Sequence, residues 1–165
     1  MVVETAYLKN AMETWGDTVL RLACSSLRDK NDAEDVYQAV FLKLYNSKQV
    51  FMSEEHLKAW LLRVTINCCK DELKSARRNR TEPLEEHYAS SAVFEVADEV
   101  DEELMAAVSE LPEKQRVALH LFYFEDLSTE EIASITNEKP STVRSHLHRA
   151  RQALRTSLGE SSYER

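Results

Sequence analysis

Glycine and proline, the two residues that most strongly interrupt helices, are almost absent from this chain. Glycine occurs only at positions 16 and 159, and proline only at positions 83, 112 and 140, in a sequence of 165 residues. Turn-rich β architectures need many more of both residues, whereas helices need few breaks. The chain is therefore predicted to be all-α.

A single acidic segment divides the chain. Residues 81–103 carry nine acidic side chains and no lysine or arginine, although the formal net charge of the whole chain is −8. The segment has weak periodicity and clustered like charges that repel one another, so we interpret it as a linker. The sequence thus predicts two small helical modules, residues 1–80 and 104–165, joined by an acidic linker at residues 81–103.

Several predicted helices begin at recognisable residues. Ser128 followed by Glu131 is a full capping box, in which each residue satisfies a backbone N–H of the other. Further N-caps are predicted at Asn31 and Ser53, while Pro112 and Pro140 suit the first helical position. Helices are predicted near residues 3–28, 32–46, 54–79, 101–109, 112–124, 129–136 and 140–158.

The last predicted helix has an acid-free outer face. Its apolar side lies within about 80° of the helical wheel and comprises Val143, Leu147, Ala150, Leu154 and Leu158. The opposite side holds arginines, histidine, serines and glutamine, with no acidic residue. A helix that faced only water would mix both signs of charge to gain i,i+4 pairs. The absence of acids therefore predicts a polyanionic partner, namely DNA.

The segment before this helix predicts a helix-turn-helix. The short capped helix at residues 129–136 ends at Asn137, a residue that tolerates the left-handed backbone of a tight turn. A longer basic helix then starts at Pro140. In helix-turn-helix domains the second helix enters the major groove of DNA with its N-terminal end. An ordinary αα-hairpin is the structural alternative.

A second cationic cluster lies at the end of the first module. Residues 58–80 contain seven lysines and arginines against two acids, Asp71 and Glu72. The sequence therefore predicts two separate cationic surfaces in a chain that is acidic overall. Alone, such a chain is expected to bind DNA weakly, and a larger assembly that holds both modules would raise the affinity of each.

Three stretches of the chain match a known order of motifs. They are DAEDVYQAVFLKLY, then HLKAWLLRVTINCCKDELKSARRNR, then LPEKQRVALHLFYFEDLSTEEIASITNEKPSTVRSHLHRARQAL. They resemble region 2.2, regions 2.3 and 2.4, and region 4 of bacterial sigma factors of the extracytoplasmic-function (ECF) group of the sigma-70 family. The resemblance implies region 2 at residues 1–80, region 4 at residues 104–165, and promoter-specific transcription initiation with core RNA polymerase.

The resemblance also implies roles for individual residues. Four residues would face core polymerase: Asp32, Asp35, Gln38 and Phe41. The melted −10 element would lie near Trp60, Asn67, Lys70, Lys74, Arg77 and Arg78, because aromatic and amide groups suit unstacked bases and cations suit phosphates. The −35 groove would face Ser141, Arg144, Ser145, His148 and Arg149, where an arginine can read a guanine. Trp60 and Phe41 suit a hydrophobic core equally well.

Two other readings remain open from the residues. A helix-turn-helix regulator would bind duplex DNA without polymerase, but it would need a sensor or phosphate-accepting α/β domain, and residues 1–80 show no βαβ alternation. A helical protein-interaction adaptor would use the acidic segment as its binding element. A gel-shift assay with and without polymerase separates these readings.

Nothing in the sequence predicts enzymatic chemistry. His146 and His148 lie two residues apart, so on a helix they point about 200° apart and cannot share a metal ion. Glycine-rich phosphate loops and paired catalytic carboxylates are not found. We therefore expect no metal, no cofactor, no small-molecule substrate and no enzymatic activity.

The chain is expected to act in the cytoplasm without membrane insertion. No apolar run approaches the roughly 20 residues of a membrane span, and the N-terminal residues lack a signal-peptide pattern. The three cysteines, Cys24, Cys68 and Cys69, argue against a disulfide framework and favour reduced thiols buried in helices. An anti-sigma factor is a further partner that the resemblance implies.

Overall fold

The computed structural model describes residues 2–79 and 102–159, and within them the chain forms helices and connecting turns without a strand. The predicted all-α fold is confirmed. Most of the predicted acidic linker lies outside the described residues, and its last two residues, Glu102 and Glu103, already belong to a helix. The helices are α1 (Val2–Leu27), α2 (Lys30–Asn46), α3 (Glu54–Asn79), α5 (Glu102–Ser109), α6 (Glu113–Tyr123), α7 (Thr129–Thr136) and α8 (Pro140–Leu158).

Three predicted helix starts are confirmed. The Ser128 side chain accepts the N–H of Glu131 at 3.1 Å, and the Glu131 carboxylate accepts the N–H of Ser128 at 3.0 Å. These hydrogen bonds to Ser128 hold the pKa of Glu131 below its ordinary value. Ser53 accepts the N–H of His56 at 3.1 Å before α3, and Pro140 opens α8.

Two predicted helix starts are wrong by one or two residues. The N-cap of α2 is Asp29, not Asn31, because the chain leaves α1 through Arg28 in a left-handed conformation with φ 60°. The Asp29 carboxylate then accepts the N–H groups of Asn31 and Asp32. Pro112 occupies the N-cap of α6 with an extended ψ of 148°, one position before the helix begins.

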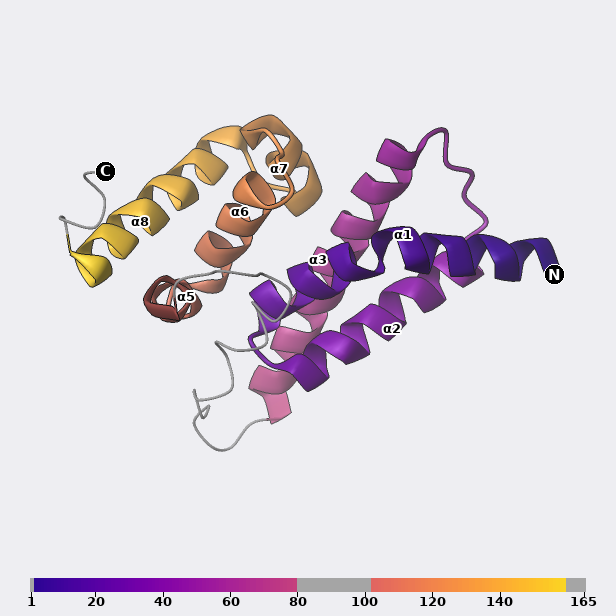
Figure 1. Cartoon of the computed structure of the whole chain (residues 1–165), viewed down its shortest axis with the longest axis horizontal. Coiled ribbons are helices and arrows are strands. Elements are labelled where there is room, and N and C mark those ends of the chain that lie inside the picture. Colours follow the sequence, from indigo (N-terminus) through magenta and orange to yellow (C-terminus); the bar gives the residue numbers. More distant parts are fainter. Residues whose placement is uncertain (1, 80–101, 160–165) are drawn as a thin grey trace.

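The first module is a bundle of α1, α2 and α3, which Figure 1 shows grouped together. Each helix turns a stripe of apolar residues toward the other two, as the 3.6-residue repeat requires. Val19 and Ala23 from α1, Val40 from α2, and Leu61 and Cys69 from α3 are at most 1% exposed. The apolar seam of α2, which holds Val36, Val40 and Leu44, therefore lies in this core.

The second module contains α5, α6, α7 and α8, with α8 packed against the other three. Leu121 of α6, Ile132 of α7, and Val143 and Ala150 of α8 are each fully buried. The apolar side that the sequence predicts for residues 140–158 is thus the side that α8 buries. Its outer side is exposed.

The two modules pack against each other, with α6 on α1 and α7 on α3. We call this packing the closed arrangement. Leu22 of α1 and Leu62 and Ile66 of α3 are at most 2% exposed, and they join the apolar core of the second module. The sequence analysis did not anticipate this contact.

Arg116 of α6 is the central polar group of the closed arrangement. The residue is 4% exposed, and its guanidinium donates to the main-chain carbonyls of Ser25, Ser26 (2.7 Å) and Leu111. Burial lowers the pKa of Arg116 to about 10, so the side chain keeps its charge at neutral pH. Beside it the Ser26 hydroxyl donates to the Glu113 carboxylate at 3.1 Å.

His120 makes the stability of the fold sensitive to mild acid. The ring is 5% exposed, and its Nε2 has no hydrogen-bond partner among the described residues. The Glu125 carboxylate lies 3.9 Å away, which is too long for a hydrogen bond. Burial, aided by the charge of Arg21, lowers the pKa of His120 to about 4. The folded ring is therefore neutral at pH 7 and forms no ion pair.

We expect the free energy of unfolding to fall as the pH is lowered from about 6.5 toward 4. In that range the unfolded chain binds a proton at His120 that the folded chain does not, and the full effect is at most about 3 kcal/mol. Urea unfolding at pH 7 and pH 5 measures the loss. The His120→Gln variant should lose less stability over this interval, and an unchanged loss would contradict the assignment.

Candidate nucleic-acid interface

The turn between α7 and α8 has the geometry of a helix-turn-helix. α7 ends at Asn137, whose φ of 59° and ψ of 45° give the predicted left-handed conformation. The N–H groups of Asn137 and Glu138 both donate to the carbonyl of Ala133, which closes the end of α7. Lys139 then takes up an extended conformation, and Pro140 begins α8. The predicted short helix, tight turn and longer basic helix are therefore present in this order.

The outer face of α8 carries all five residues that we predict to lie against the −35 groove. Every one of them is exposed, and at 100° per residue they cover about 140° of the helix surface: Ser141, Arg144, Ser145, His148 and Arg149. The opposite side holds the buried core residues of α8. No acidic side chain occurs on α8, so the exposed face combines hydrogen-bonding groups with positive charge and carries no negative charge.

Arg151 is basic but belongs to a different surface of the second module. Its Nε donates to the Tyr123 hydroxyl at 2.9 Å, and its guanidinium lies over the rings of Phe122 and Tyr123 at 5.5 and 5.6 Å. Such a cation–π contact holds the side chain against α6. Arg151 therefore stabilises the packing of α8 rather than extending the exposed face.

The predicted −10 residues lie on one face of α3. Trp60, Asn67, Lys70 and Lys74 fall within about 80° of each other around the helix. Asn67 and Lys74 are exposed, whereas Trp60 is half-buried with its ring edge-on to Phe51 at 5.5 Å. Arg77 and Arg78 also belong to α3, but their side chains lie outside the described residues.

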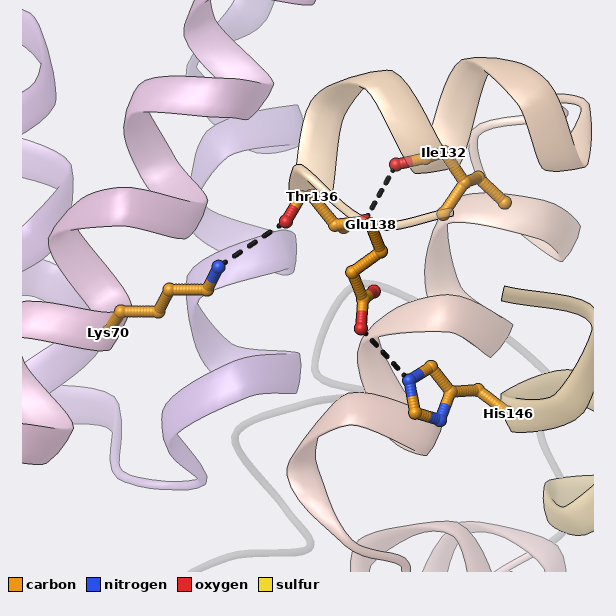
Figure 2. A network of polar contacts seen from close by, with 5 residues as sticks. All are labelled: Lys70, Ile132, Thr136, Glu138 and His146. Atoms are coloured by element: carbon orange, nitrogen blue, oxygen red, sulfur yellow. Dashed lines mark hydrogen bonds and ion pairs between the residues drawn. The ribbon is translucent and has the colours of Figure 1, made fainter. Parts of the chain in front are cut away.

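Part of this cationic face is covered by the second module. Lys70 Nζ donates to the main-chain carbonyl of Thr136, at the end of α7, at 3.4 Å (Figure 2). About two turns of α3 further toward its start, Arg63 donates to the Ser134 hydroxyl, also at 3.4 Å. In the closed arrangement the carbonyl end of α7 thus occupies the ammonium group of Lys70.

Lys58 makes a third contact between the cations of α3 and the second module. Its Nζ lies 3.2 Å from the carboxylate of Glu125, whose side chain is 7% exposed. The same ammonium group sits 5.7 Å from the centre of the Trp15 ring in α1. Since Lys58 is 25% exposed, the ion pair is partly shielded from water, and its Coulomb attraction is screened less than that of a pair on an open surface.

The predicted polymerase face of α2 needs one correction. Asp35 and Gln38 are exposed and Asp32 is partly exposed, but Phe41 is 3% exposed and packs against Tyr37 with a ring distance of 4.9 Å. Phe41 therefore belongs to the core of the first module and cannot contribute to a contact surface. It directly follows the seam residue Val40, and this position already suited the core.

The same face of α2 continues into two exposed apolar residues that sequence reasoning missed. Leu42 is 61% and Tyr45 is 43% exposed, and both follow Asp35 and Gln38 at the i, i+3, i+7, i+10 spacing of one helix face. Exposed apolar groups that lie together mark a surface for a protein partner. The 3.6-residue repeat could have predicted their exposure, because it places Leu42 and Tyr45 away from the buried seam of α2.

The remaining candidate chemistry finds no support in the described helices. Residues 2–79 and 102–159 contain no group of three or more histidine, cysteine or carboxylate side chains that could hold a metal ion. Burial raises the pKa of Cys69 to about 12 and also raises that of Cys68, so both thiols are protonated at neutral pH. Across the described part of the chain, no helix is both long and apolar enough to cross a membrane.

Comparison with protein families agrees with the order of the motifs. Residues 11–79 match the family described as Sigma-70 region 2, and residues 101–154 match Sigma-70, region 4. The first match covers α2, α3 and most of α1. The second covers α5 to α8 up to the last turn of the basic helix.

Individual relatives lead to the same family. The chain is 34% identical to the ECF RNA polymerase sigma factor SigE of Mycolicibacterium smegmatis, over 93% of this chain and 65% of that relative's length. It is 30% identical to the RNA polymerase sigma factor SigV of Bacillus subtilis, over 84% of this chain and 82% of the relative.

Solved structures share the fold. The sigma factor RpoE of Bartonella quintana, in complex with the anti-sigma factor NepR, superposes with a TM-score of 0.73 at 24% identity, covering 95% of this chain and 98% of that one. CnrH, in complex with the cytosolic domain of CnrY, gives a TM-score of 0.63 at 18% identity, covering 93% of this chain and 88% of that one. With regions 2 and 4 in this order and relatives that match most of its length, the chain belongs to the extracytoplasmic-function group of the sigma-70 family of RNA polymerase sigma factors.

Proposed function

We propose that this chain directs promoter-specific transcription initiation by binding core RNA polymerase and the −10 and −35 elements of promoter DNA. The observation that carries the proposal is the exposed face of α8, which presents donors and positive charge without an acid at the end of a helix-turn-helix. The chain's membership in the sigma factor family supports core polymerase and the −10 element as its further partners. Since polymerase and promoters lie in the cytoplasm, the proposed function places the chain there.

Each proposed contact follows from the chemistry of the face that makes it. Arg144 and Arg149 can each donate two hydrogen bonds to a guanine edge or bind phosphates, and the small Ser141 lets the tip of α8 approach the groove. On α3, Asn67 and Lys74 would meet unstacked bases and phosphates of the −10 element. On α2, Asp35 and Gln38 together with the neighbouring apolar residues would contact polymerase.

The closed arrangement has to open before both elements can be bound. Two turns of DNA, about the gap that the family bridges, measure ~70 Å. Residues 80–101, which connect α3 to α5, can span at most ~75 Å when extended, so they are long enough for the modules to separate and bridge this gap. Lys70 would then exchange the Thr136 carbonyl for DNA.

A protein that holds the chain inactive is a further proposed partner. The two solved structures compared above are complexes of a sigma factor with an anti-sigma factor and of CnrH with the cytosolic domain of CnrY. We extend this class of partner to the present chain, with the exposed face of α2 and its apolar residues as a surface that such a protein could cover.

Transcription with purified core polymerase tests the proposal directly. Core polymerase with this chain should produce a transcript of defined start from a promoter selected by the chain, and core polymerase alone should not. A gel-shift assay of the chain without polymerase should show only weak, salt-sensitive binding. Specific duplex binding without polymerase, combined with no transcript in its presence, would instead indicate an independent helix-turn-helix regulator.

A further inference from the structure

Glu138 places a carboxylate in the turn that leads into the proposed DNA-reading helix. It lies three residues before Ser141, the first residue of the exposed face of α8. A free carboxylate at this position would repel the phosphates of a bound promoter, because like charges in a partly desolvated interface interact strongly. The face of α8 itself contains no acid, so Glu138 is the acidic residue nearest in sequence to its tip.

His146 holds this carboxylate against the flank of α8. Its Nε2 lies 3.0 Å from the Glu138 Oε2, and Figure 2 shows the Glu138 side chain directed toward the imidazole ring. Both side chains are mostly buried, with 14% of His146 and 18% of Glu138 exposed. On the helical wheel His146 lies between the exposed Arg149 and the buried Ala150, about 60° and 40° away.

The main chain of Glu138 is fixed as firmly as its side chain. Its N–H donates to the carbonyl of Ala133 in α7 at 2.9 Å, while its carboxylate is held by α8. The residue therefore bridges the two helices of the helix-turn-helix, and its carboxylate has one defined position. That position is on the flank of α8, away from the exposed outer face.

We propose that His146 is a positioning residue for −35 recognition, which acts by holding the Glu138 carboxylate away from the DNA backbone. This inference rests on the proposed function, because it assumes that the outer face of α8 meets DNA. His146 itself touches no base or phosphate in this scheme. Its effect passes entirely through Glu138, so removal of the negative charge should make His146 dispensable.

Three variants of the full chain, assembled with core polymerase, test the inference. They are His146→Ala, Glu138→Gln and the double variant, each assayed for open-complex formation on a promoter that requires its −35 element. His146→Ala should weaken promoter binding about fivefold at low salt, with a smaller defect at high salt because screening reduces the repulsion. Glu138→Gln should bind at least as tightly as the wild type, and the double variant should return to within about twofold of it.

The matched control is Asp126→Asn in the His146→Ala background. Asp126 is an exposed acid of the same module, in a left-handed conformation with φ 56° that asparagine also adopts well. Its neutralisation removes one negative charge, as Glu138→Gln does, but should not rescue binding. Equal rescue by both substitutions would show that promoter binding responds only to the net charge of the module, and this result would overturn the inference.

A double variant that stays as weak as His146→Ala would also overturn it, because His146 would then support the fold rather than hold a charge. The thermal midpoint of each variant shows whether folding is affected, and Glu138→Gln leaves His146 an amide oxygen to bond. Failure of the proposed function gives a different result, since the wild-type chain itself would then produce no open complex.

Discussion

Reversing the charges of Arg144 and Arg149 together is expected to abolish initiation from promoters that need a −35 contact. Both side chains are exposed on the outer face of α8, where they have no acid beside them on the helix. A good arginine–guanine pair contributes about 1–3 kcal/mol, so loss of two contacts should lower promoter occupancy at least about 30-fold. Glutamates would add repulsion of the phosphates. Transcription with purified core polymerase measures the effect.

Arg155→Glu is the matched control for each of the single variants, Arg144→Glu and Arg149→Glu. Arg155 is exposed in the last turn of the same helix, far from the end that enters the groove. Compared with Arg144→Glu or Arg149→Glu alone, it has the same change of charge and should retain most of the activity. Normal initiation by the double variant, with α8 folded, would show that this face does not meet the −35 element.

Locking the closed arrangement should have an effect of similar size. Arg63 and Ser134 face each other between α3 and α7, with a hydrogen bond of 3.4 Å. We expect that cysteines at these two positions, joined by a bismaleimide with an internal disulfide, will hold the modules together. Initiation should then fall about 100-fold, because neither module can gain from the binding of the other. Reduction of the cross-linker should restore activity in the same transcription assay.

The cross-linking experiment needs a background without the native cysteines and two controls. Arg63→Cys alone, treated with a monofunctional maleimide, shows the effect of modifying α3, and the untreated double-cysteine protein gives the reference activity. If the cross-linked chain still initiates fully from a promoter that needs both elements, the modules do not have to separate.

The helices were predictable because their signals are local. Capping residues, proline at a helix start and the 3.6-residue period all act within a few positions, and they placed α3, α7 and α8 at their observed starts. The error at α2 has the same origin. Asp29 and Asn31 are both good N-caps by type, and the choice between them depends on the left-handed Arg28, which the sequence does not reveal.

The outer face of α8 was also predictable from a local signal, because the 3.6-residue repeat alone separates the buried side of the helix from the exposed side. Phe41 shows where this reasoning ends, because a large aromatic at the edge of an apolar seam fits either core or surface. Its burial is decided by packing beside Tyr37 and Val40. Conversely, Leu42 and Tyr45 fit a core by residue type but lie on the open side of α2.

The closed arrangement could not be predicted from the sequence, because several of its polar contacts, unlike the Lys58–Glu125 ion pair, use main-chain acceptors that every residue possesses. Lys70 donates to a main-chain carbonyl, and so does Arg116. Such pairs leave no complementary charge for a sequence pattern to detect. The contacting segments are also far apart along the chain, about 66 residues for Lys70 and Thr136.

Arg116 has a consequence for the last turn of α1. The final carbonyls of a helix have no partner within it, and here the guanidinium occupies those of Ser25 and Ser26. The second module thus supplies the C-terminal cap of a helix in the first. When the modules part, water can hydrate the same carbonyls and the freed guanidinium, so α1 exchanges one cap for another without unwinding. Undocking would then leave each bundle intact.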